Sequence, residues 1–360
     1  MCPRKSEVRA MKNLSKTSRM NFLTYAIVIV AYVIIQILNS SVGLSSSLKG
    51  MLVPICAYVV MALSLNLVVG ISGELSLGHA GFMSVGAFTG VTVALALRDV
   101  VASGSLRLLI GMLVGAVFAA IAGLLIGIPV LRLKGDYLAI VTLAFGQIIK
   151  SIVTNLYVGV DGKGLHFSFL TNNLNLAEGG RTILSGPMGI TTIEKLSTFT
   201  AGFLLVMFTL VVVFNLVNSR AGRAIMAIRD NRIAAESVGI SVSKYRLMAF
   251  VVASALADMA GTLFAMNYST IIASKFDFNT SILVLVFVVL GGQGNMLGSI
   301  VAATFLTILP EIRFMRNLAD YRMLVYAVVL ILVMLVTNSD QLKSLFRRMI
   351  PKRKEASTNG

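Results

Sequence analysis

Long apolar segments separated by short polar ones are the feature that most limits how this 360-residue chain can fold. A helix crosses the hydrocarbon core of a bilayer with about 20 predominantly apolar residues, and several segments approach or exceed that length. Ten-residue segments of alternating polarity, which are typical of barrel strands, are not evident. Charged residues make up 13% of the chain, whereas soluble domains carry about 25%. The sequence therefore predicts an all-α polytopic membrane protein.

We expect about ten transmembrane helices, some of them broken. The predicted crossings are, in chain order, Asn21–Leu38, Gly50–Gly70, Ala80–Leu97, Leu106–Val130, Tyr137–Leu156, Leu196–Val217, Leu247–Asn267, Thr280–Leu290, Leu297–Leu309 and Tyr321–Val336. The two short crossings that flank Gly291–Asn295 are also consistent with half-helices. Eight crossings plus broken elements is therefore the alternative count.

The basic residues indicate the orientation of the chain. They are concentrated in residues 1–20, in the loop 218–246 and in residues 339–360, whereas the polar connection 158–195 has no basic excess. Because cytoplasmic loops are enriched in Lys and Arg, the first three segments are predicted to be cytoplasmic and the connection extracytoplasmic. The transmembrane domain then covers residues 21–338. This distribution accounts for the net charge of +16 without a nucleic-acid partner, and we expect none.

A charged segment, Gly222–Gly239, separates two of the apolar runs. Its arginines and acidic residues cannot lie in hydrocarbon at a tolerable cost, so the segment must lie in water and against another surface. Asp230 is expected to cap a helix that starts at Asn231, and Gly239 is expected to end that helix in a left-handed turn. The prediction is a short cytoplasmic helix of about two turns.

This short helix has a small apolar face formed by Ile233, Ala234 and Val238, while Ala235 permits close approach of another surface. One interpretation is a helix that rests on lipid headgroups. The interpretation that we favour is docking in a groove of a partner protein.

Two glycine-rich interruptions, Gly70–His79 and Gly291–Gly298, break the apolar pattern. Irregular backbone at membrane depth persists only where it faces protein or a water-filled cavity. The ends of broken helices offer free N–H groups to anions and free carbonyls to cations. The interruptions are therefore the candidates for a solute path. The candidate path residues are Gly73, Glu74, Ser76, Gly78, His79, Gly291, Gly292, Gly294 and Asn295. Close helix packing is the alternative explanation for Gly78, Gly86 and Gly298.

His79 and Asp258 are ionisable side chains beside or within the predicted crossings, and each needs an explanation. His79 is predicted to be a hydrogen-bonded structural histidine rather than a ligand or a proton relay. Asp258 needs a partner or a proton at its depth, and we expect it to be a structural group satisfied by hydrogen bonds. The alternatives are a functional feature of this chain or access of water to this depth.

The sequence contains none of the familiar catalytic patterns. G-x-x-x-x-G-K-[ST], G-x-S-x-G and H-E-x-x-H are all absent, so neither ATP hydrolysis nor hydrolase chemistry is assigned to this chain, and no catalytic residue is predicted. Cys2 and Cys56 provide neither a disulfide framework nor a metal cluster. We therefore expect no metal site.

Three segments resemble one known family. They are Leu65–Gly90, Gly222–Gly261 and Val288–Ala303, and they occur in the order found in permease subunits of ABC importers of branched-chain amino acids. The chain is most similar to the larger of the two permease subunits of such systems. Asp258 departs from the family pattern, which has a small residue at this position.

The resemblance implies a multi-pass protein of the bacterial inner membrane, with both termini in the cytoplasm. It implies four kinds of partner: a second permease subunit, two cytoplasmic ATP-binding subunits that hold ATP and Mg, an extracytoplasmic solute-binding protein, and membrane lipid. No cofactor is expected on this chain itself. The residues implied in coupling to the ATP-binding subunits are Gly222, Arg223, Arg229, Asp230, Ala234, Ala235, Glu236 and Gly239. Branched-chain amino acids are the family's usual solutes, but no residue here selects among them and other amino acids, amides or urea.

Two rival functions remain at this point. A secondary transporter driven by an ion gradient would need ionisable residues in the membrane, and Glu74, His79 and Asp258 are the suggestive ones. An intramembrane enzyme would need a paired nucleophile and base, which the crossings do not offer.

Overall fold

The computed structural model describes residues 5–41, 46–133, 135–161, 164–170, 174, 180–309 and the single positions 324, 328 and 331. Its contacts divide the chain into two units, Met1–Ile308 and Leu309–Gly360. The helices and strands named below all lie in the first unit. The predicted crossing Tyr321–Val336, apart from the three single positions, and the tail 339–360 lie outside the described residues.

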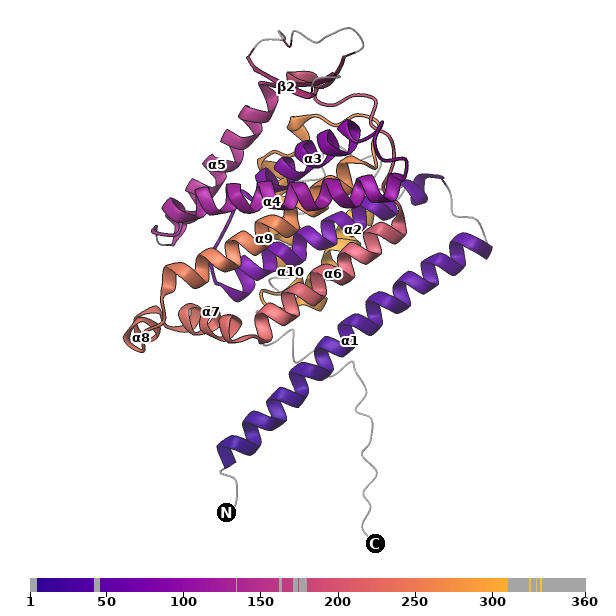
Figure 1. The fold of residues 1–360 in the computed structure, drawn as a ribbon. Coiled ribbons are helices and arrows are strands. Elements are labelled where there is room, and N and C mark those ends of the chain that lie inside the picture. Colours follow the sequence, from indigo (N-terminus) through magenta and orange to yellow (C-terminus); the bar gives the residue numbers. More distant parts are fainter. Residues whose placement is uncertain are drawn as a thin grey trace. The chain divides into compact units, whose positions relative to one another are not determined.

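Helices dominate the first unit (Figure 1). They are α1 (Lys5–Ser41), α2 (Ser46–Asn66), α3 (His79–Ala96), α4 (Gly104–Val130), α5 (Asp136–Thr154), α6 (Phe199–Asn218), α7 (Arg220–Asp230), α8 (Arg232–Ser237), α9 (Val242–Ala265), α10 (Phe278–Gly291) and α11 (Met296–Ile308). Within the described part of the chain, eight helical stretches are long and apolar enough to cross a membrane, and Met296–Ile308 is a shorter apolar helix. The polytopic helical class is confirmed, and a helix covers most of each predicted crossing from Asn21–Leu38 to Leu297–Leu309.

α9 packs against α2, α3 and α4 and forms the centre of the first unit (Figure 1). Glycines allow these helices to approach closely. A Cβ atom at Gly261 of α9 would collide with the Met83 carbonyl of α3. One at Gly86 of α3 would collide with the backbone of Asp258, and the Thr262 hydroxyl donates a hydrogen bond of 2.9 Å to the Gly86 carbonyl. Close packing therefore accounts for Gly86.

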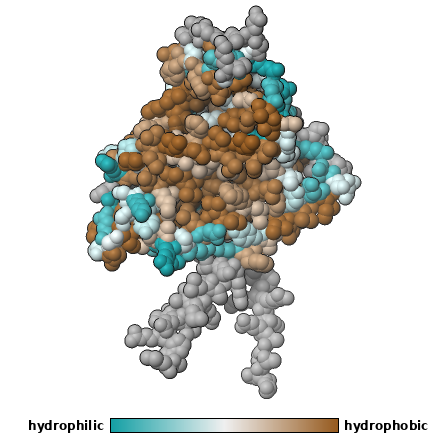
Figure 2. All heavy atoms as spheres, viewed as in Figure 1, coloured by the Kyte–Doolittle hydropathy of each residue, from teal (hydrophilic) through white to brown (hydrophobic). Residues whose placement is uncertain are grey.

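The outer face of α4 is apolar and uncovered. Leu109, Leu113 and Val117 are each more than half exposed. Figure 2 shows apolar side chains over the middle of this face of the molecule and hydrophilic ones gathered towards its margins. A soluble protein rarely exposes so much apolar surface, whereas a helix that faces hydrocarbon requires it.

A three-stranded antiparallel sheet follows α5, and the sequence predicted this region only as a loop. Its strands are β1 (Leu156–Asp161), β2 (Gly164–Phe169) and β3 (Arg181–Ser185), in the order β2-β1-β3. Strands of five or six residues give too short an alternating signal to be recognised. Ile190 forms isolated bridges with Leu184 and with Ile271, so the sheet is joined to the turn after α9. We call this the sheet end of the helices, and the opposite end the α7–α8 end.

Candidate functional site

The first break, Leu67–Gly78, separates α2 from α3. It begins with a π-helix at Leu67–Ile71 that follows α2 directly, and regular α-helix resumes only at His79. Gly73 has a φ of +75°, in the left-handed region that glycine adopts without strain. The glycine-rich interruption predicted from the sequence is therefore a true interruption of the helix.

The second break, Gly292–Asn295, separates α10 from α11. Gly292 and Gly294 have φ values of +91° and +82°. The chain folds back so tightly that a Cβ atom at Gly298 would collide with the Gly291 carbonyl. Close packing of the two short helices therefore accounts for Gly298.

The side chain of Asn66, the last residue of α2 before the first break, binds the second break. Its amide oxygen accepts a hydrogen bond of 2.8 Å from the Gly294 N–H, and its amide nitrogen donates one of 3.2 Å to the Asn295 carbonyl. The same nitrogen donates to the Ser299 hydroxyl at 2.8 Å. A Cβ atom at Gly70 would collide with the backbone of Gly294, so the two segments are in direct contact. Asn66 has no role in the sequence prediction, although an amide inside an apolar crossing is a signal that could have found it.

Other predicted path residues are packed against neighbouring helices. Ser76 and His79 are each 1% exposed. His79 Nε2 lies 2.8 Å from the Ser64 hydroxyl oxygen, which agrees with a structural histidine. A Cβ atom at Gly78 would collide with the Thr142 carbonyl of α5, so close packing accounts for this glycine too.

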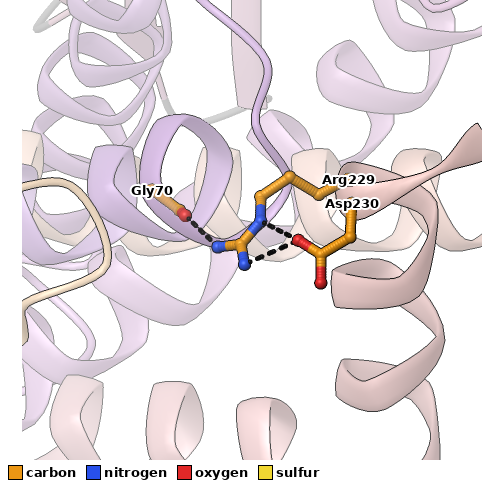
Figure 3. A network of polar contacts seen from close by, with 3 residues as sticks. All are labelled: Gly70, Arg229 and Asp230. Carbon is orange, nitrogen blue, oxygen red and sulfur yellow. Dashed lines mark hydrogen bonds and ion pairs between the residues drawn. The ribbon is translucent and has the colours of Figure 1, made fainter.

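Arg229 of α7 reaches the first break, as Figure 3 shows. Its Nη1 donates a hydrogen bond of 3.0 Å to the Gly70 carbonyl, at the end of the π-helix. Its Nε and Nη2 donate to Asp230 Oδ1 at 3.1 and 2.9 Å. The aliphatic part of the side chain lies against Gly73, where a Cβ atom would come within 2.6 Å of the Arg229 Cγ. The resemblance implied that Arg229 acts towards a partner, whereas the structure directs its guanidinium into this chain.

Asp230 does not cap α8, and the prediction that it would is wrong by one residue. Asn231 is the cap, because its side-chain oxygen accepts a hydrogen bond of 3.1 Å from the Ala234 N–H. Asn231 also has the extended backbone, with φ −154° and ψ 103°, that a capping residue needs. Asp230 instead ends α7, and its carboxylate orients Arg229.

α8 is anchored on one face and open on the other. Ala235 is buried with Ile228 of α7 and Val242 of α9. Ile233 and Val238 are 80% and 74% exposed. The predicted apolar side chains Ile233 and Val238 are therefore exposed, whereas Ala235 packs against the rest of the chain.

The turn after α8 also agrees with prediction. Gly239 has a φ of +83°, and its N–H donates a hydrogen bond of 3.0 Å to the Glu236 carbonyl. The side chain of Glu236 pairs with Arg232 at 3.0 Å on the surface.

The remaining coupling residues lie on the same two helices. Gly222 is buried in the first turn of α7, and its N–H bonds to the capping hydroxyl of Ser219 at 3.1 Å. Arg223 is exposed and donates to the Asn218 carbonyl at 3.0 Å. Ala234 is exposed on α8. The predicted coupling residues therefore belong to one continuous surface element, α7 and α8.

A buried ion pair links the first break to α9. Glu74 Oε1 lies 2.6 Å from Arg246 Nε, and Glu74 is only 5% exposed. Burial raises the pKa of the Glu74 carboxyl from its ordinary value of 4.5 to about 7, against the lowering effects of Arg246 and Arg232. A cavity of about 490 Å³ opens beside this pair, between the first break, the turn from α4 to α5, and α8. The sequence prediction included Glu74 but not its partner Arg246.

Asp258 lacks the hydrogen bonds that the sequence analysis expected. It is fully buried in α9, and neither carboxylate oxygen has a hydrogen-bond partner among the described residues. A Cβ atom at Gly115 of α4 would collide with one of these oxygens. The carboxylate is therefore enclosed by closely packed helices.

A bundle of membrane-spanning helices, two joined helix breaks and an exposed short helix beside them define a polytopic helical membrane protein of the permease class. A family model described as the branched-chain amino acid transport system / permease component matches residues 47–334, and the chain belongs to this family.

Named relatives agree with this assignment. The chain is 38% identical over 293 residues to the high-affinity branched-chain amino acid transport system permease protein LivM of Salmonella typhimurium, and 36% identical over 293 residues to that of Escherichia coli. Each alignment covers 77% of this chain and 66% of the relative, so the chain spans slightly less than two thirds of these proteins. A probable LivM of Methanocaldococcus jannaschii is 27% identical over 278 residues, covering 67% of this chain and 74% of that protein. No solved structure matches the chain.

Proposed function

We propose that this chain is the transmembrane permease subunit of an ABC importer that moves branched-chain or related amino acids into the cytoplasm. Two cytoplasmic ATP-binding subunits, which hold the ATP and Mg, supply the energy. A second permease subunit completes the path, and an extracytoplasmic solute-binding protein delivers the solute. The family and the LivM relatives support this proposal. The observation that carries it is α8, which is anchored through Ala235 and presents Ile233 and Val238 outward.

In this proposal the protein lies in the bacterial inner membrane, with the α7–α8 end and both termini in the cytoplasm. The arginines of α7 and α8 favour that orientation. The sheet end then faces the solute-binding protein.

The proposed mechanism transmits movement through two side-chain links. A displacement of α8 by the ATP-binding subunits moves α7, and Arg229 passes this movement to the Gly70 carbonyl. The Glu74–Arg246 ion pair joins α9 to the same break. Asn66 directly precedes the first break and bonds to the second, and Gly70 contacts Gly294, so the two breaks move together and change access between the two sides of the membrane.

The breaks also suit the chemistry of the proposed solute. An amino acid carries a carboxylate and an ammonium group, and interrupted helices offer free N–H groups to the one and free carbonyls to the other. We therefore propose that the solute passes the predicted path residues around Gly73 and Asn295.

Replacing Ile233 and Val238 with aspartate is expected to lower ATP-driven uptake in proteoliposomes at least tenfold. An aspartate in an apolar docking interface costs about 2 kcal/mol or more, which weakens association roughly thirtyfold. Val100 is 79% exposed at the sheet end, so Val100→Asp is the matched control and should leave uptake unchanged. Equal effects at both ends would contradict docking at α8. Uptake that needs an ion gradient and no ATP-binding subunit would establish the secondary-transporter alternative instead.

Replacing Arg229 with methionine is expected to uncouple ATP hydrolysis from uptake. Methionine keeps the apolar contact with Gly73 but cannot donate to the Gly70 carbonyl, and a hydrogen bond with a charged donor contributes about 1.5–3 kcal/mol. We expect the number of solute molecules moved per ATP to fall several-fold. Lysine keeps a charged donor but lacks the planar guanidinium group, so Arg229→Lys should recover part of the number of solute molecules moved per ATP.

The control for this experiment separates coupling from docking. Ser237 is exposed on α8, so a Ser237→Cys variant offers a thiol to an ATP-binding subunit. Cross-linking through this thiol should be equally efficient whether the chain keeps Arg229 or also carries Arg229→Met. A loss of cross-linking in Arg229→Met would show that Arg229 serves docking and would overturn its role as a link to the break.

A further inference from the structure

The cavity of about 490 Å³ beside the first break has a polar wall and an apolar wall. The polar wall contains Glu74, Arg232 and Arg246. The apolar wall includes Leu75 and Leu138. The cavity lies at the α7–α8 end, beyond the membrane-spanning part of α2 and α3.

Among the described lining residues, the polar wall holds one carboxylate and two guanidinium groups. Arg246 pairs with Glu74 at 2.6 Å through Oε1. Arg232 lies close enough to Glu74 to favour its ionised form, and it also pairs with the exposed Glu236. A ligand with a single charged group could add a contact to either Glu74 or Arg232 but not to both. A zwitterion can contact both, its ammonium group at Glu74 and its carboxylate at Arg232.

The apolar wall suits an aliphatic side chain. Both Leu138, which is 3% exposed, and Leu75, which is 38% exposed, line the cavity. Ile233 of α8 also borders the space. A ligand with a short branched hydrocarbon group would remove these surfaces from water, whereas a phosphate or a metal ion would not.

We propose that this cavity binds a zwitterionic aliphatic amino acid, with the ligand carboxylate on Arg232, its ammonium group against Glu74 and its side chain along Leu75. The site is reached from the side that the proposed function assigns to the cytoplasm, so this inference rests on that function and deepens it. An amino acid bound here lies between α8 and the first break, which are the two elements between which the proposed mechanism transmits movement. The accumulated product therefore restrains the junction and slows further import.

The binding experiment uses the purified full chain in detergent, without partner subunits, and radiolabelled L-leucine in a scintillation proximity assay. We expect saturable binding that L-valine and L-isoleucine displace. 4-Methyl-2-oxopentanoate lacks the ammonium group and 3-methylbutylamine lacks the carboxylate, so each should compete at least tenfold less well. Equal competition by the oxo acid, or displacement by inorganic phosphate or phosphatidylglycerol micelles, would show a plain anion site and overturn the proposal.

Amino-acid substitutions in the cavity test whether leucine binds there. Arg232→Gln should weaken leucine binding at least tenfold, and Leu75→Trp should abolish it by filling the cavity. The matched controls are Arg220→Gln, on exposed α7 surface, and Val100→Trp at the sheet end; both should bind as the unmodified chain does. Unchanged binding in Arg232→Gln and Leu75→Trp would place the leucine elsewhere and overturn the proposal.

A second measurement tests the feedback role with the assembled importer. In proteoliposomes preloaded with leucine on the side of the ATP-binding subunits, uptake should slow several-fold, and Leu75→Trp should remove this inhibition. ATP-driven uptake that is insensitive to preloading would overturn the feedback role while leaving the proposed function intact. Loss of leucine binding when ATP-binding subunits are added would show that a partner fills the cavity, which overturns it as well.

Discussion

Replacing Gly70 with valine is expected to abolish uptake and to lower the thermal stability of the protein. A Cβ atom at this position would collide with the Asn66 amide and with the backbone of Gly294. Overpacking against a side chain costs about 1–3 kcal/mol. Here one of the obstacles is backbone, so the two breaks must separate to accommodate the larger side chain. Uptake in proteoliposomes and the unfolding temperature in detergent measure the two effects.

Gly50→Val is the matched control for this prediction. Gly50 lies in the same helix, α2, and a Cβ atom there has nothing within 4 Å. We expect this variant to insert, unfold and transport as the unmodified chain does. A Gly70→Val variant that transports normally would show that contact between the breaks has no part in function.

Replacing Arg246 with methionine is expected to destabilise the protein by about 3–5 kcal/mol, because Glu74 then keeps a buried charge without its partner. The double variant Arg246→Met with Glu74→Gln removes both charges, and stability should recover most of the loss. Uptake should stay low in both variants if the ion pair joins α9 to the first break. Thermal unfolding in detergent at pH 8 gives the stability, and a double variant no more stable than the single one would show that the pair is not the cause.

The pH dependence of stability provides a further check on Glu74. Its folded pKa of about 7 lies above the ordinary 4.5, so the folded chain holds a proton over this interval that the unfolded chain has lost. The Glu74 contribution therefore makes the free energy of unfolding fall as the pH rises from about 4.5 to about 7. Arg246 and Arg232 are the charged groups that oppose the shift. Glu74→Gln should flatten this part of the profile, and an unchanged slope would contradict the assignment.

The sequence predicted the features that follow from the difference between water and hydrocarbon. Charges at Arg223 and Arg229 exclude the α7–α8 segment from lipid wherever the chain folds, so its position could be recognised. The glycines of both breaks could be recognised as well, because they interrupt otherwise continuous apolar runs. Both features are properties of single segments of the chain, so they can be recognised from one sequence alone.

Features that depend on contacts between distant segments were not predictable in this way. The bonds of Asn66 join residues 228 apart, and the partner of Glu74 lies on another helix. The prediction of the residue that caps α8 was wrong by one position, because Asp and Asn cap helices about equally well. Asp258 was expected to have hydrogen bonds, but whether a buried carboxylate has a partner depends on how its neighbours pack.

The single amide of Asn66 has a consequence for the kinetics of the conformational change. If the two breaks were independent, each could shift alone, and partly switched intermediates would accumulate. Asn66 directly precedes the first break and bonds to the second, so displacing one break relative to the other loses two or more hydrogen bonds inside an apolar environment, and the pair keeps one degree of freedom. Switching should therefore be all-or-none, with a single relaxation time at both breaks.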